Sequence, residues 1–552
     1  MALPRAFRAP SACLASALLC GALAACGGGG GGGAATEPPP VDVSAVAAAD
    51  PGTALPASWK NGAFMEIHVR AYKDSDGDGK GDLRGLIQSL DYLQGLGITG
   101  LWLMPVTDSQ DRDHGYSVSN YRGIERDYGS LADFDELLAQ AHARGIGVII
   151  DYVINHSAFD NPIFAHSRNS TANAYRDWYV WQAVVPAGWS IFGSNPWYGA
   201  GTGAYFAAFF SQMPDFNLRN TQVLDYHRSN LRFWLNRGVD GFRFDAVGNL
   251  VENGPAAWEN QPENDEVMNA MRQVVAGYAN RYMVCEAPGA PQRYAAPTSC
   301  GGSFAFGQQF NMVNATSGDV AAVAATATYY NTGPTNPSAA TLAGFLSNHD
   351  SFASFNGNRV WDWVGGNAAR YRLAAATNLL QSTTPFIYYG EEIGMAGGAG
   401  LSGDPKLRTP MSWNGNAVNA GFTTGRPFRA LSANVAANNV AAQEADANSL
   451  LSFYKAVISL RKSRPSLMSG SYVAGTANGT LASFRRVLGA EQTLVVFNYG
   501  STPATATIDG LPAGVTLPRL WPASGGAGSV DVAGQARIDL QAQSFAVFAV
   551  GP

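Results

Sequence analysis

The stretch Val239–Val247, Val-Asp-Gly-Phe-Arg-Phe-Asp-Ala-Val, sets a guanidinium and a carboxylate two residues apart in an apolar run. On a strand, that spacing points the side chains of Arg243 and Asp245 to the same face. An arginine beside a carboxylate keeps the acid ionised and oriented, which a nucleophile or an electrostatic stabiliser requires. A structural ion pair explains the stretch equally well, so the rest of the chain has to decide between the two.

Three further segments end an apolar run with polar or ionisable side chains. They are Asp151-Tyr152-Val153-Ile154-Asn155-His156, Met283-Val284-Cys285-Glu286 and Phe345-Leu346-Ser347-Asn348-His349-Asp350. Taken singly, each polar residue could be a cap or a loop residue. Together with Arg243 and Asp245 they form a set in which each member follows a different predicted strand. In a barrel, all of these side chains point into the same mouth.

The segment Asp74–Asp82, Asp-Ser-Asp-Gly-Asp-Gly-Lys-Gly-Asp, carries four carboxylates at near-alternate positions of a glycine-rich turn. Hard oxygen ligands that converge from one loop are typical of calcium sites, and a structural Ca²⁺ is the cofactor that we predict. The predicted metal site comprises Asp74, Asp76, Asp78, Lys80 and Asp82. The loop resembles part of an EF-hand, although no glutamate closes it and a strand precedes it. A solvated acidic loop is the alternative.

From Phe64 onwards, short apolar runs alternate with helical stretches. We expect strands at 64–69, 98–104, 147–154, 241–244, 282–285, 342–346 and 385–389, and helices at 83–96, 131–143, 221–236, 267–279 and 368–381. One further strand–helix unit is expected between residues 300 and 331. Eight such units predict an α/β fold, a (β/α)8 TIM barrel with the site at the C-terminal strand ends. An open doubly wound sheet is the competitor, but no glycine-rich phosphate loop follows the first strand.

Two stretches interrupt this alternation. Residues 157–220 lack a clear period and are dense in Trp, Tyr, Asn and Gly, so we expect an inserted domain after the third strand. After Leu460 short β-like runs replace the helical pattern, which predicts a C-terminal antiparallel β-sandwich at 463–552. The barrel is therefore expected in two parts, 59–156 and 221–462.

The N-terminus has the pattern of an export signal. Arg5 and Arg8 precede the apolar run 13–25, which ends in Leu23-Ala24-Ala25-Cys26 and is too short to span a bilayer. This ending resembles the bacterial lipobox, which implies a signal peptide at 1–25 and lipid on Cys26; an ordinary secretory signal is the alternative. Gly27 after the cysteine favours the outer membrane of a Gram-negative bacterium. Residues 26–58 have no hydrophobic period and are expected to form a flexible tether.

Composition restricts the classes of binding partner that we expect. The net charge is −6 and basic clusters are absent, which argues against nucleic acid. Membrane attachment is expected only through the N-terminal lipid. An exported chain permits disulfides, and for Cys285 and Cys300 both a disulfide and two separate thiols remain open.

The four segments that end at His156, Asp245, Glu286 and Asp350 resemble the four signature regions of the α-amylase family, glycoside hydrolase family 13, in order and spacing. The resemblance covers most of the chain from about Ala63 to the end. It implies a retaining glycosidase with Asp245 as the nucleophile and Glu286 as the general acid/base. Asp350 would be the third carboxylate, which stabilises the transition state.

The same resemblance implies roles for the neighbouring residues. Arg243 would orient Asp245, and His156 and His349 would hydrogen-bond the sugar that precedes the scissile bond. Asp151 and Asn155 would have structural roles. Since the nucleophile must be ionised and the general acid protonated, we expect Arg243 to keep Asp245 charged and apolar surroundings to raise the pKa of Glu286.

Further motifs narrow the resemblance. Asp113-His114-Gly115-Tyr116 resembles the family loop whose tyrosine stacks on the same sugar, and Asp113 and Arg408 resemble the ion pair that closes the site in α-glucosidases. Met213-Pro214-Asp215-Phe216-Asn217 resembles the fifth region of a group between oligo-1,6-glucosidases and neopullulanases. Gly248-Asn249 depart from the Lys-His that many α-amylases carry after the nucleophile, which weakens the case for endo-acting binding.

We therefore expect an enzyme that cleaves α-glucosidic bonds, mainly α-1,4, of starch or maltodextrin, and within this class an α-amylase. An exo-acting α-glucosidase or oligo-1,6-glucosidase, or a glucosyltransferase, is the alternative. A non-catalytic maltodextrin-binding protein of the same fold is the alternative from a different class. The expected partner is an α-glucan or a maltooligosaccharide, and the chain is expected to be a monomer.

Overall fold

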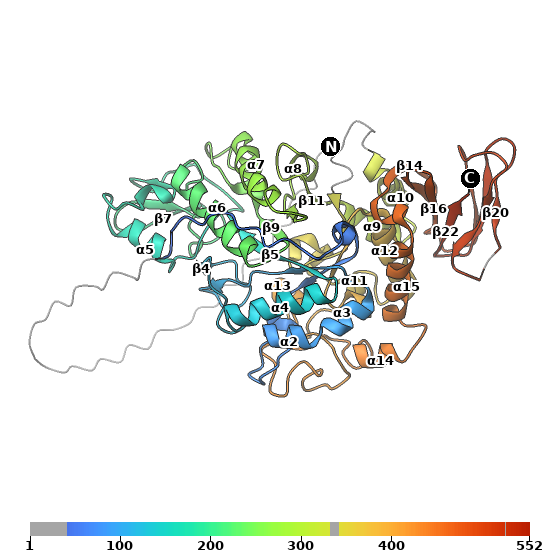
Figure 1. Ribbon diagram of the computed structural model, residues 1–552, viewed down its shortest axis with the longest axis horizontal. Coiled ribbons are helices and arrows are strands. Elements are labelled where there is room, and N and C mark those ends of the chain that lie inside the picture. Colours follow the sequence, from blue (N-terminus) through green and yellow to red (C-terminus); the bar gives the residue numbers. More distant parts are fainter. Residues whose placement is uncertain (1–40, 332–341, 525, 552) are drawn as a thin grey trace, which may run out of the picture. The chain divides into compact units, whose positions relative to one another are not determined.

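The computed structural model describes residues 41–331, 342–524 and 526–551, so the predicted signal peptide and lipidation site lie outside the described residues. Its centre is an eight-stranded parallel sheet (Figure 1). The strands are β1 (Phe64–Ile67), β2 (Gly100–Leu103), β5 (Gly147–Val153), β9 (Gly241–Asp245), β10 (Tyr282–Cys285), β11 (Ser303–Phe304), β12 (Leu342–Ala343) and β13 (Phe386–Tyr388). Strands β1 and β13 pair directly, and a parallel bridge between Gly344 and Pro385 joins β12 to β13. The sheet is therefore closed, and the predicted TIM barrel is confirmed.

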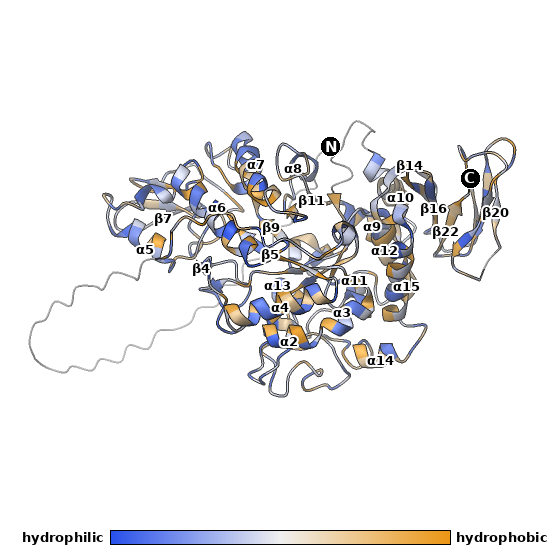
Figure 2. Ribbon diagram, in the orientation of Figure 1, coloured by the Kyte–Doolittle hydropathy of each residue, from blue (hydrophilic) through white to orange (hydrophobic). Residues whose placement is uncertain are grey.

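Helices follow the strands and cover the barrel. They are α2 (Leu83–Gln88), α3 (Leu90–Leu96), α4 (Leu131–Ala143), α6 (Thr221–Asn236), α7 (Pro262–Ala276), α8 (Pro291–Tyr294), α9 (Gln308–Ala315), α10 (Val320–Thr328), α12 (Ala368–Gln381) and α15 (Leu450–Ser463). The helix expected over 83–96 is divided at Ser89 into α2 and α3. Helix α4 begins with a capping box between Ser130 and Asp133 and buries one apolar face (Figure 2).

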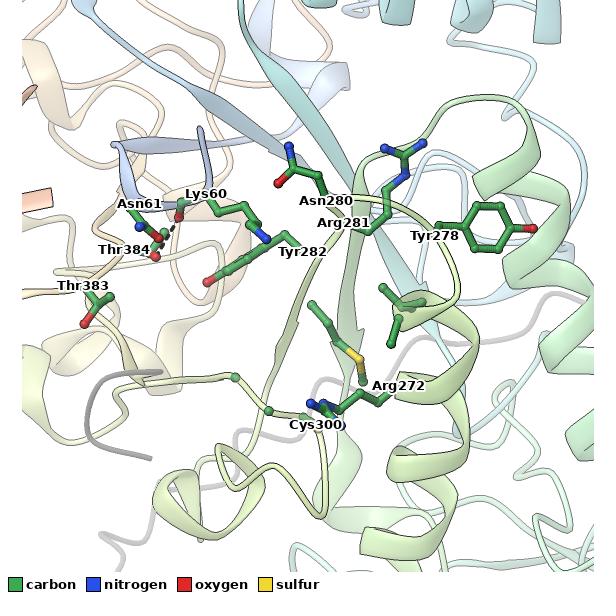
Figure 3. Close-up of a pocket in the computed structure, with 15 residues that line it drawn as sticks. Lys60, Asn61, Arg272, Tyr278, Asn280, Arg281, Tyr282, Cys300, Thr383 and Thr384 are labelled. Carbon is green, nitrogen blue, oxygen red and sulfur yellow. Dashed lines mark hydrogen bonds between the residues drawn. The ribbon is translucent and has the colours of Figure 1, made fainter. Parts of the chain in front are cut away.

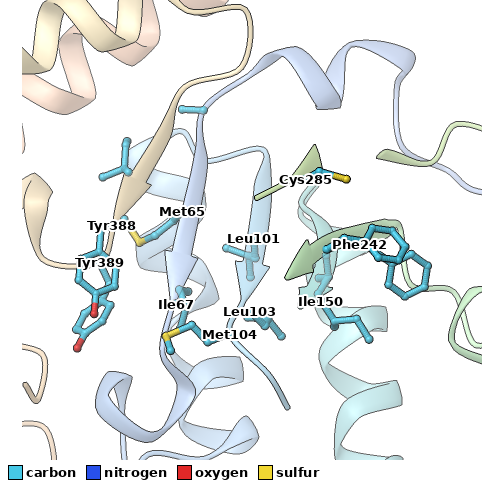
Figure 4. Close-up of a cluster of buried hydrophobic side chains, with 14 of the residues drawn as sticks. Met65, Ile67, Leu101, Leu103, Met104, Ile150, Phe242, Cys285, Tyr388 and Tyr389 are labelled. Atoms are coloured by element: carbon cyan, nitrogen blue, oxygen red, sulfur yellow. The ribbon is translucent and has the colours of Figure 1, made fainter. Parts of the chain in front are cut away.

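Side chains of the barrel strands alternate between the interior and the helical layer. Phe64, Trp102, Ile149, Val284 and Phe386 belong to an interior cluster. Their neighbours belong to the main cluster, several of whose members are drawn in Figure 4, such as Met65, Leu101, Ile150 and Phe242. Because side chains alternate with period two, a residue two positions after an interior residue also faces inward. This alternation directs Glu66, Asp151, Arg243 and Asp245 toward the interior, near the C-terminal strand ends.

Residues 157–220 form the expected insertion after β5. It contains helix α5 (Pro162–Asn169) and an antiparallel sheet in the order β6 (Trp181–Gln182), β8 (Ala204–Phe206), β7 (Trp197–Gly199). The amide of Asn155, at the end of β5, donates a 3.0 Å hydrogen bond to the carboxylate of Asp215. A backbone bridge also pairs His156 with Asp215. The insertion is thus fixed to the end of the strand that carries His156.

The C-terminal part is an antiparallel β-sandwich, as predicted. One sheet has the order β14 (Ser471–Asn478), β15 (Leu481–Leu488), β16 (Glu491–Asn498), β22 (Ser544–Val550), β19 (Arg519–Trp521). The facing strands are β17 (Ala504–Ile508) with β21 (Ala536–Leu540), and β18 (Thr516–Leu517) with β20 (Gly528–Ser529). Apolar side chains from both layers form one buried cluster between them.

Two buried arginines, one on a barrel helix and one on a sandwich strand, lie where the sandwich meets the barrel. Arg461 of α15 and Arg486 of β15 are fully buried, and neither has a carboxylate partner within the described ranges. Both donate to carbonyl oxygens at the C-terminal end of α12, where Ser382 accepts from Arg461 at 2.8 Å and from Arg486 at 3.2 Å. A cation at this end of a helix is favourable because the carbonyl groups there lack helical partners.

Residues 41–58, predicted to belong to a flexible tether, lie instead against the barrel. Arg122 pairs with Asp42 at 2.9 Å and donates to the carbonyl of Ser44 at 2.8 Å. Further along, the carboxylate of Asp50 accepts from the N–H of Ala279 at 2.8 Å. None of the helices in the described part of the chain has both the length and the hydrophobicity needed to cross a membrane.

Candidate active site

Arg243 is the centre of the candidate site. It is fully buried, and its Nη1 lies 2.8 Å from oxygens of both Asp151 and Asp245. Its Nη2 lies 2.5 Å from Glu286. Asp151 stands opposite Arg243 in the register of β5 and β9. One guanidinium therefore gathers carboxylates from three neighbouring strands. The sequence predicted the contact with Asp245 and a shared mouth for these side chains, but not the contacts of Arg243 with Asp151 and Glu286.

Asp245 ends β9 and Glu286 follows β10, so the two carboxyl groups approach from adjacent strands. Burial raises the pKa of Asp245 to about 6, with Arg243 opposing the rise. Burial also raises the pKa of Glu286 to about 8, because the apolar surroundings disfavour a second negative charge beside Asp245. Arg243 thus does not lower the pKa of Asp245 below its usual value, but near pH 7 Asp245 is ionised and Glu286 is protonated. This division can serve a nucleophile and a general acid.

The residue after Asp245 has an unusual backbone. Ala246 has φ of 52°, in the left-handed region that residues with a Cβ rarely adopt. In this conformation its N–H points to Glu286, whose carboxylate accepts it at 3.3 Å. The sharp turn after β9 therefore contributes a donor to the neighbouring carboxyl group.

His349 lies between two carboxylates. Its Nδ1 is 2.5 Å from Glu66, and its Nε2 is 3.1 Å from Asp350. Burial would lower the pKa of His349, but Asp350 and Glu66 outweigh burial and raise it to about 10. Against the effect of burial, His349 and then Arg408 hold the pKa of Asp350 well below its usual value. Sequence reasoning missed Glu66, although a lone carboxylate in the apolar run Phe64–Ile67 is the signal that could have identified it.

Tyr116 and His156 complete the wall of a pocket of about 550 Å³ that also exposes Asp245, Glu286 and Asp350. The hydroxyl of Tyr116 donates to Asp151 at 2.9 Å, and its ring stacks on His349. His156 is buried and its Nε2 has no hydrogen-bond partner in the described part of the chain. Burial lowers the pKa of His156 to about 3, so it faces the pocket as a neutral imidazole. A buried polar nitrogen without a protein partner among the described residues thus lies in the pocket wall.

The predicted ion pair between Asp113 and Arg408 is wrong. Asp113 pairs with Arg429, whose Nη2 lies 2.9 and 2.8 Å from the two carboxylate oxygens. Arg408 instead pairs with Asp350 at 2.9 Å and with Asp404 at 3.2 Å. Arg429 was missed because it lies in a long loop without a periodic pattern, where no sequence signal indicates its direction.

Of the predicted metal loop, only the first half forms a cluster of carboxylates. Single oxygens of Asp74, Asp76 and Asp78 all lie within 4.8 Å of one another. That separation fits ligands placed around one Ca²⁺ at about 2.3–2.6 Å. Asp82 lies outside the cluster because it caps α2 and accepts from Gly85 at 2.7 Å. The ammonium group of Lys80 is paired with Asp78 and Asp127, so the atom of Lys80 that could bind the metal is its main-chain carbonyl oxygen.

Cys285 and Cys300 form a disulfide, which settles the alternative left open by the sequence. The bond joins the residue before Glu286 to the loop that leads into β11. It therefore fixes the strand end that presents Glu286.

A second cavity of about 480 Å³ lies near the opposite ends of the strands. Tyr282 begins β10 there, and Thr384 precedes β13; Figure 3 shows both with Lys60, Arg272 and Arg281. None of the carboxylates around Arg243 lines this cavity. In barrels of this type, that face contributes to stability rather than to catalysis.

Comparisons with known proteins agree with this geometry. Residues 66–470 match the family description "Alpha amylase, catalytic domain". An oligo-1,6-glucosidase from Parageobacillus thermoglucosidasius is 30% identical over 518 residues, covering 80% of this chain and 90% of that protein. Alpha-amylase 3 from Dictyoglomus thermophilum is 33% identical over 448 residues, covering 80% of this chain and 85% of that protein. The crystal structure of an α-glucosyl transfer enzyme superposes with a TM-score of 0.75 at 28% identity, covering 90% of this chain and 99% of that one.

Proposed function

The chain belongs to the α-amylase family of glycoside hydrolases, and on this basis we propose that it is an exo-acting α-glucosidase that releases glucose from short α-glucosides. The ion pair between Asp113 and Arg429 is the observation that carries the proposal. Arg429 also donates to the carbonyl of Arg408 at 3.0 Å, and Arg408 lines the pocket beside Asp350. The pair thus ties the loop after β2 to the loop after β13 directly behind the pocket wall. A chain of glucose units cannot continue through a wall closed in this way.

The proposed reaction is a double displacement. The carboxylate of Asp245 attacks the anomeric carbon while Glu286 gives its proton to the leaving oxygen, so the glycosidic bond breaks as the glucosyl ester forms. Water then attacks the same carbon, its proton passes to Glu286, and Asp245 leaves as a carboxylate. The shared contact with Arg243 supports this assignment, because a retaining glycosidase needs its two carboxyl groups close together.

The remaining polar groups are proposed to bind the sugar. Asp350, held ionised by His349 and Arg408, would stabilise positive charge at the anomeric centre. The free Nε2 of His156 and the ring of Tyr116 would contact the same glucose unit. His156, His349 and Asp350 match positions of the family's signature segments, and Tyr116 matches the family loop that begins at Asp113.

We propose that Ca²⁺ binds to the loop of Asp74, Asp76 and Asp78 and has a structural role. Contacts between this loop and residues 422–428 support that role, since the N–H of Asp74 donates to Phe422 and the N–H of Phe428 donates to Gly79. The lipobox-like sequence before Cys26 leads us to propose export and lipid anchoring at the outer membrane. The proposed working unit is a monomer.

A product-profile time course on amylose, maltose, pullulan and sucrose tests the activity. The expected first product from maltose is glucose, and amylose should shorten from its ends without a rapid loss of iodine colour. Random internal cleavage of amylose would refute the exo-acting proposal in favour of an α-amylase. Asp245→Asn and Glu286→Gln should each lower the rate of hydrolysis at least a thousandfold, while the variants still unfold in a cooperative thermal transition.

A further inference from the structure

The cavity of about 480 Å³ near the N-terminal ends of the barrel strands is lined by cations and not by acids. We call it the basal cavity. Lys60, Arg272 and Arg281 contribute to its wall, and no aspartate or glutamate does so among the described residues (Figure 3). The chain as a whole carries a net charge of −6, so its composition does not explain three cations gathered without an acid. Such a group attracts anions.

Arg281 is the one cation of the three that the protein itself neutralises. It is buried, with its Nη2 at 3.4 Å from Asp50 and its Nη1 at 3.6 Å from Asp240. Its Nη2 also donates to the carbonyl of Gly52 at 3.1 Å. Only its buried Nε lacks a hydrogen-bond partner in the described part of the chain. The positive charge that remains unbalanced in the basal cavity therefore comes from the other two side chains.

Lys60 and Arg272 have no such compensation. Lys60 belongs to the short helix η1 (Ala57–Asn61) and Arg272 to α7, and both are half-buried. Within the residues that the structure describes, neither side chain takes part in an ion pair or a hydrogen bond. Burial lowers the pKa of Lys60, and no neighbouring charge contributes to the shift. A partly buried charge without a partner destabilises the folded state, so a purely structural role does not account for these two side chains.

The backbone after the disulfide makes room for Arg272. Gly301 follows Cys300 and has φ of 75°. A Cβ at Gly301 would lie 2.7 Å from the Nε of Arg272, so the arginine side chain lies directly against the glycine. In Figure 3, Arg272 and Lys60 reach toward the basal cavity from different segments of the chain. Two unbalanced cations are thus presented to the same space by separate elements.

The rest of the polar lining suits hydroxyl groups. The hydroxyl of Thr383 makes no hydrogen bond within the described residues. The amide nitrogens of Asn61 and Asn280 already donate to neighbouring groups, which leaves their amide oxygens to accept. A volume of about 480 Å³ also lies within the range of about 300–1,000 Å³ that is typical of sites for small organic molecules. The basal cavity can therefore hold more than a single inorganic ion.

We propose that the basal cavity binds a sugar phosphate, with Lys60 and Arg272 contacting the phosphate group. Phosphate oxygens accept hydrogen bonds; lysine neutralises them as a point charge and arginine through its planar fork of N–H donors. The phosphate supplies the counter-charge that both cations lack, and the amide and hydroxyl groups of the lining bind the sugar. Inorganic phosphate shares the first of these contacts but not the second. The site is separate from the carboxylates around Arg243 and does not depend on the proposed hydrolysis.

Isothermal titration calorimetry on the intact protein at low ionic strength tests the site, with glucose 6-phosphate and inorganic phosphate as the two probes. Glucose 6-phosphate should bind at least about tenfold more tightly than inorganic phosphate. Lys60→Gln and Arg272→Gln should each weaken the binding of glucose 6-phosphate about tenfold, because each removes a charge-assisted contact. Without ligand, both variants should melt at or above the temperature of the wild type, since each loses an unbalanced charge.

Lys462→Gln is the matched control, since it removes the same charge at an exposed lysine outside the basal cavity. It should leave the affinity within twofold of the wild type. His156→Ala, in the catalytic pocket, should do the same.

Four outcomes would overturn the inference. They are no binding of either probe, equal losses in Lys462→Gln and Lys60→Gln, binding that His156→Ala removes and Lys60→Gln does not, and a clear drop in melting temperature in Lys60→Gln and Arg272→Gln. Equal affinities for the two probes would overturn the sugar phosphate as the ligand and leave inorganic phosphate in its place.

Discussion

Asp113 and Arg429 form a two-point ion pair in which one guanidinium nitrogen lies 2.9 and 2.8 Å from the two carboxylate oxygens. The residues are far apart in sequence, and the pair joins two loops at the C-terminal end of the barrel. The same guanidinium holds the backbone of Arg408, which contacts Asp350. Specificity is thereby connected to residues that do not touch the reacting atoms.

Arg429→Ala should lower kcat/KM for maltose at least tenfold, because the loop that carries Asp113 loses its anchor. The relative rate on long maltooligosaccharides should rise as the wall opens. Rates on maltose and on maltoheptaose measure both effects. Arg426→Ala, at an exposed arginine of the same loop, should leave both rates unchanged. Equal losses on both substrates would contradict a role in chain-length selection.

The rate should have a bell-shaped dependence on pH. Asp245 must be ionised and its pKa is raised to about 6, so kcat/KM should fall as the pH drops below about 6. Glu286 must be protonated and its pKa is raised to about 8, so kcat/KM should fall as the pH rises above about 8. Steady-state kinetics from pH 4 to 10 give both limbs. An alkaline limb near pH 5 would contradict the assignment of Glu286 as the acid.

The pH dependence of stability provides an independent test of the raised pKa of Glu286. Its folded pKa is raised above the ordinary value of 4.5, so the protonated form stabilises the fold at low pH. That contribution is lost as the pH rises from about 4.5 to about 8, because the unfolded chain binds fewer protons over this range. Glu286→Gln should therefore gain stability relative to the wild type at pH 8–9 compared with pH 5. Chemical denaturation at several pH values measures the difference.

Removal of Ca²⁺ should lower the melting temperature and also the activity. The loop of Asp74, Asp76 and Asp78 contacts residues 422–428, and Arg429 follows directly. Loss of the metal would loosen this segment and weaken the pair with Asp113. Calorimetry and maltose hydrolysis with and without a chelator measure both effects. The double variant Asp76→Asn, Asp78→Asn should melt lower and be insensitive to the chelator; an unchanged wild-type melt would argue against the site.

The disulfide should contribute to stability as expected for a loop of its length. Cys285 and Cys300 are separated by 15 residues, for which the loss of unfolded-state entropy corresponds to about 3 kcal/mol. Cys300→Ser should lower the free energy of unfolding by about this amount. A reductant should destabilise the wild type similarly and have no effect on the variant.

The sequence was sufficient to predict the barrel, the insertion and the sandwich, because period-two and period-3.6 patterns report which side of each element is buried. It was also sufficient to predict that Arg243, Asp245, Glu286 and Asp350 lie at one edge of the barrel, because parallel strands end together. The protonation states of these carboxyl groups were harder to predict from the sequence. Burial of Asp245 opposes Arg243, and the balance depends on the whole surrounding pocket.

What the sequence could not predict depends on the course of long loops. Arg429 rather than Arg408 reaches Asp113, and Asp82 caps a helix instead of joining its neighbours in the metal loop. Residues 41–58 are poor in hydrophobic period but are held by side chains of the barrel such as Arg122. Irregular segments are fixed by single polar contacts, and such contacts leave no periodic trace in the chain.

The buried arginines Arg461 and Arg486 have a consequence for how the protein unfolds. Arg461 of the barrel helix α15 and Arg486 of the sandwich strand β15 both donate to carbonyl oxygens at the end of α12, so the two parts of the chain meet at one set of backbone groups. Separating the two parts would leave the guanidinium group of Arg486 without the carbonyl partners that α12 supplies. The sandwich is therefore not an interchangeable module: the two parts form a single cooperative unit, and heating should produce one calorimetric peak for both.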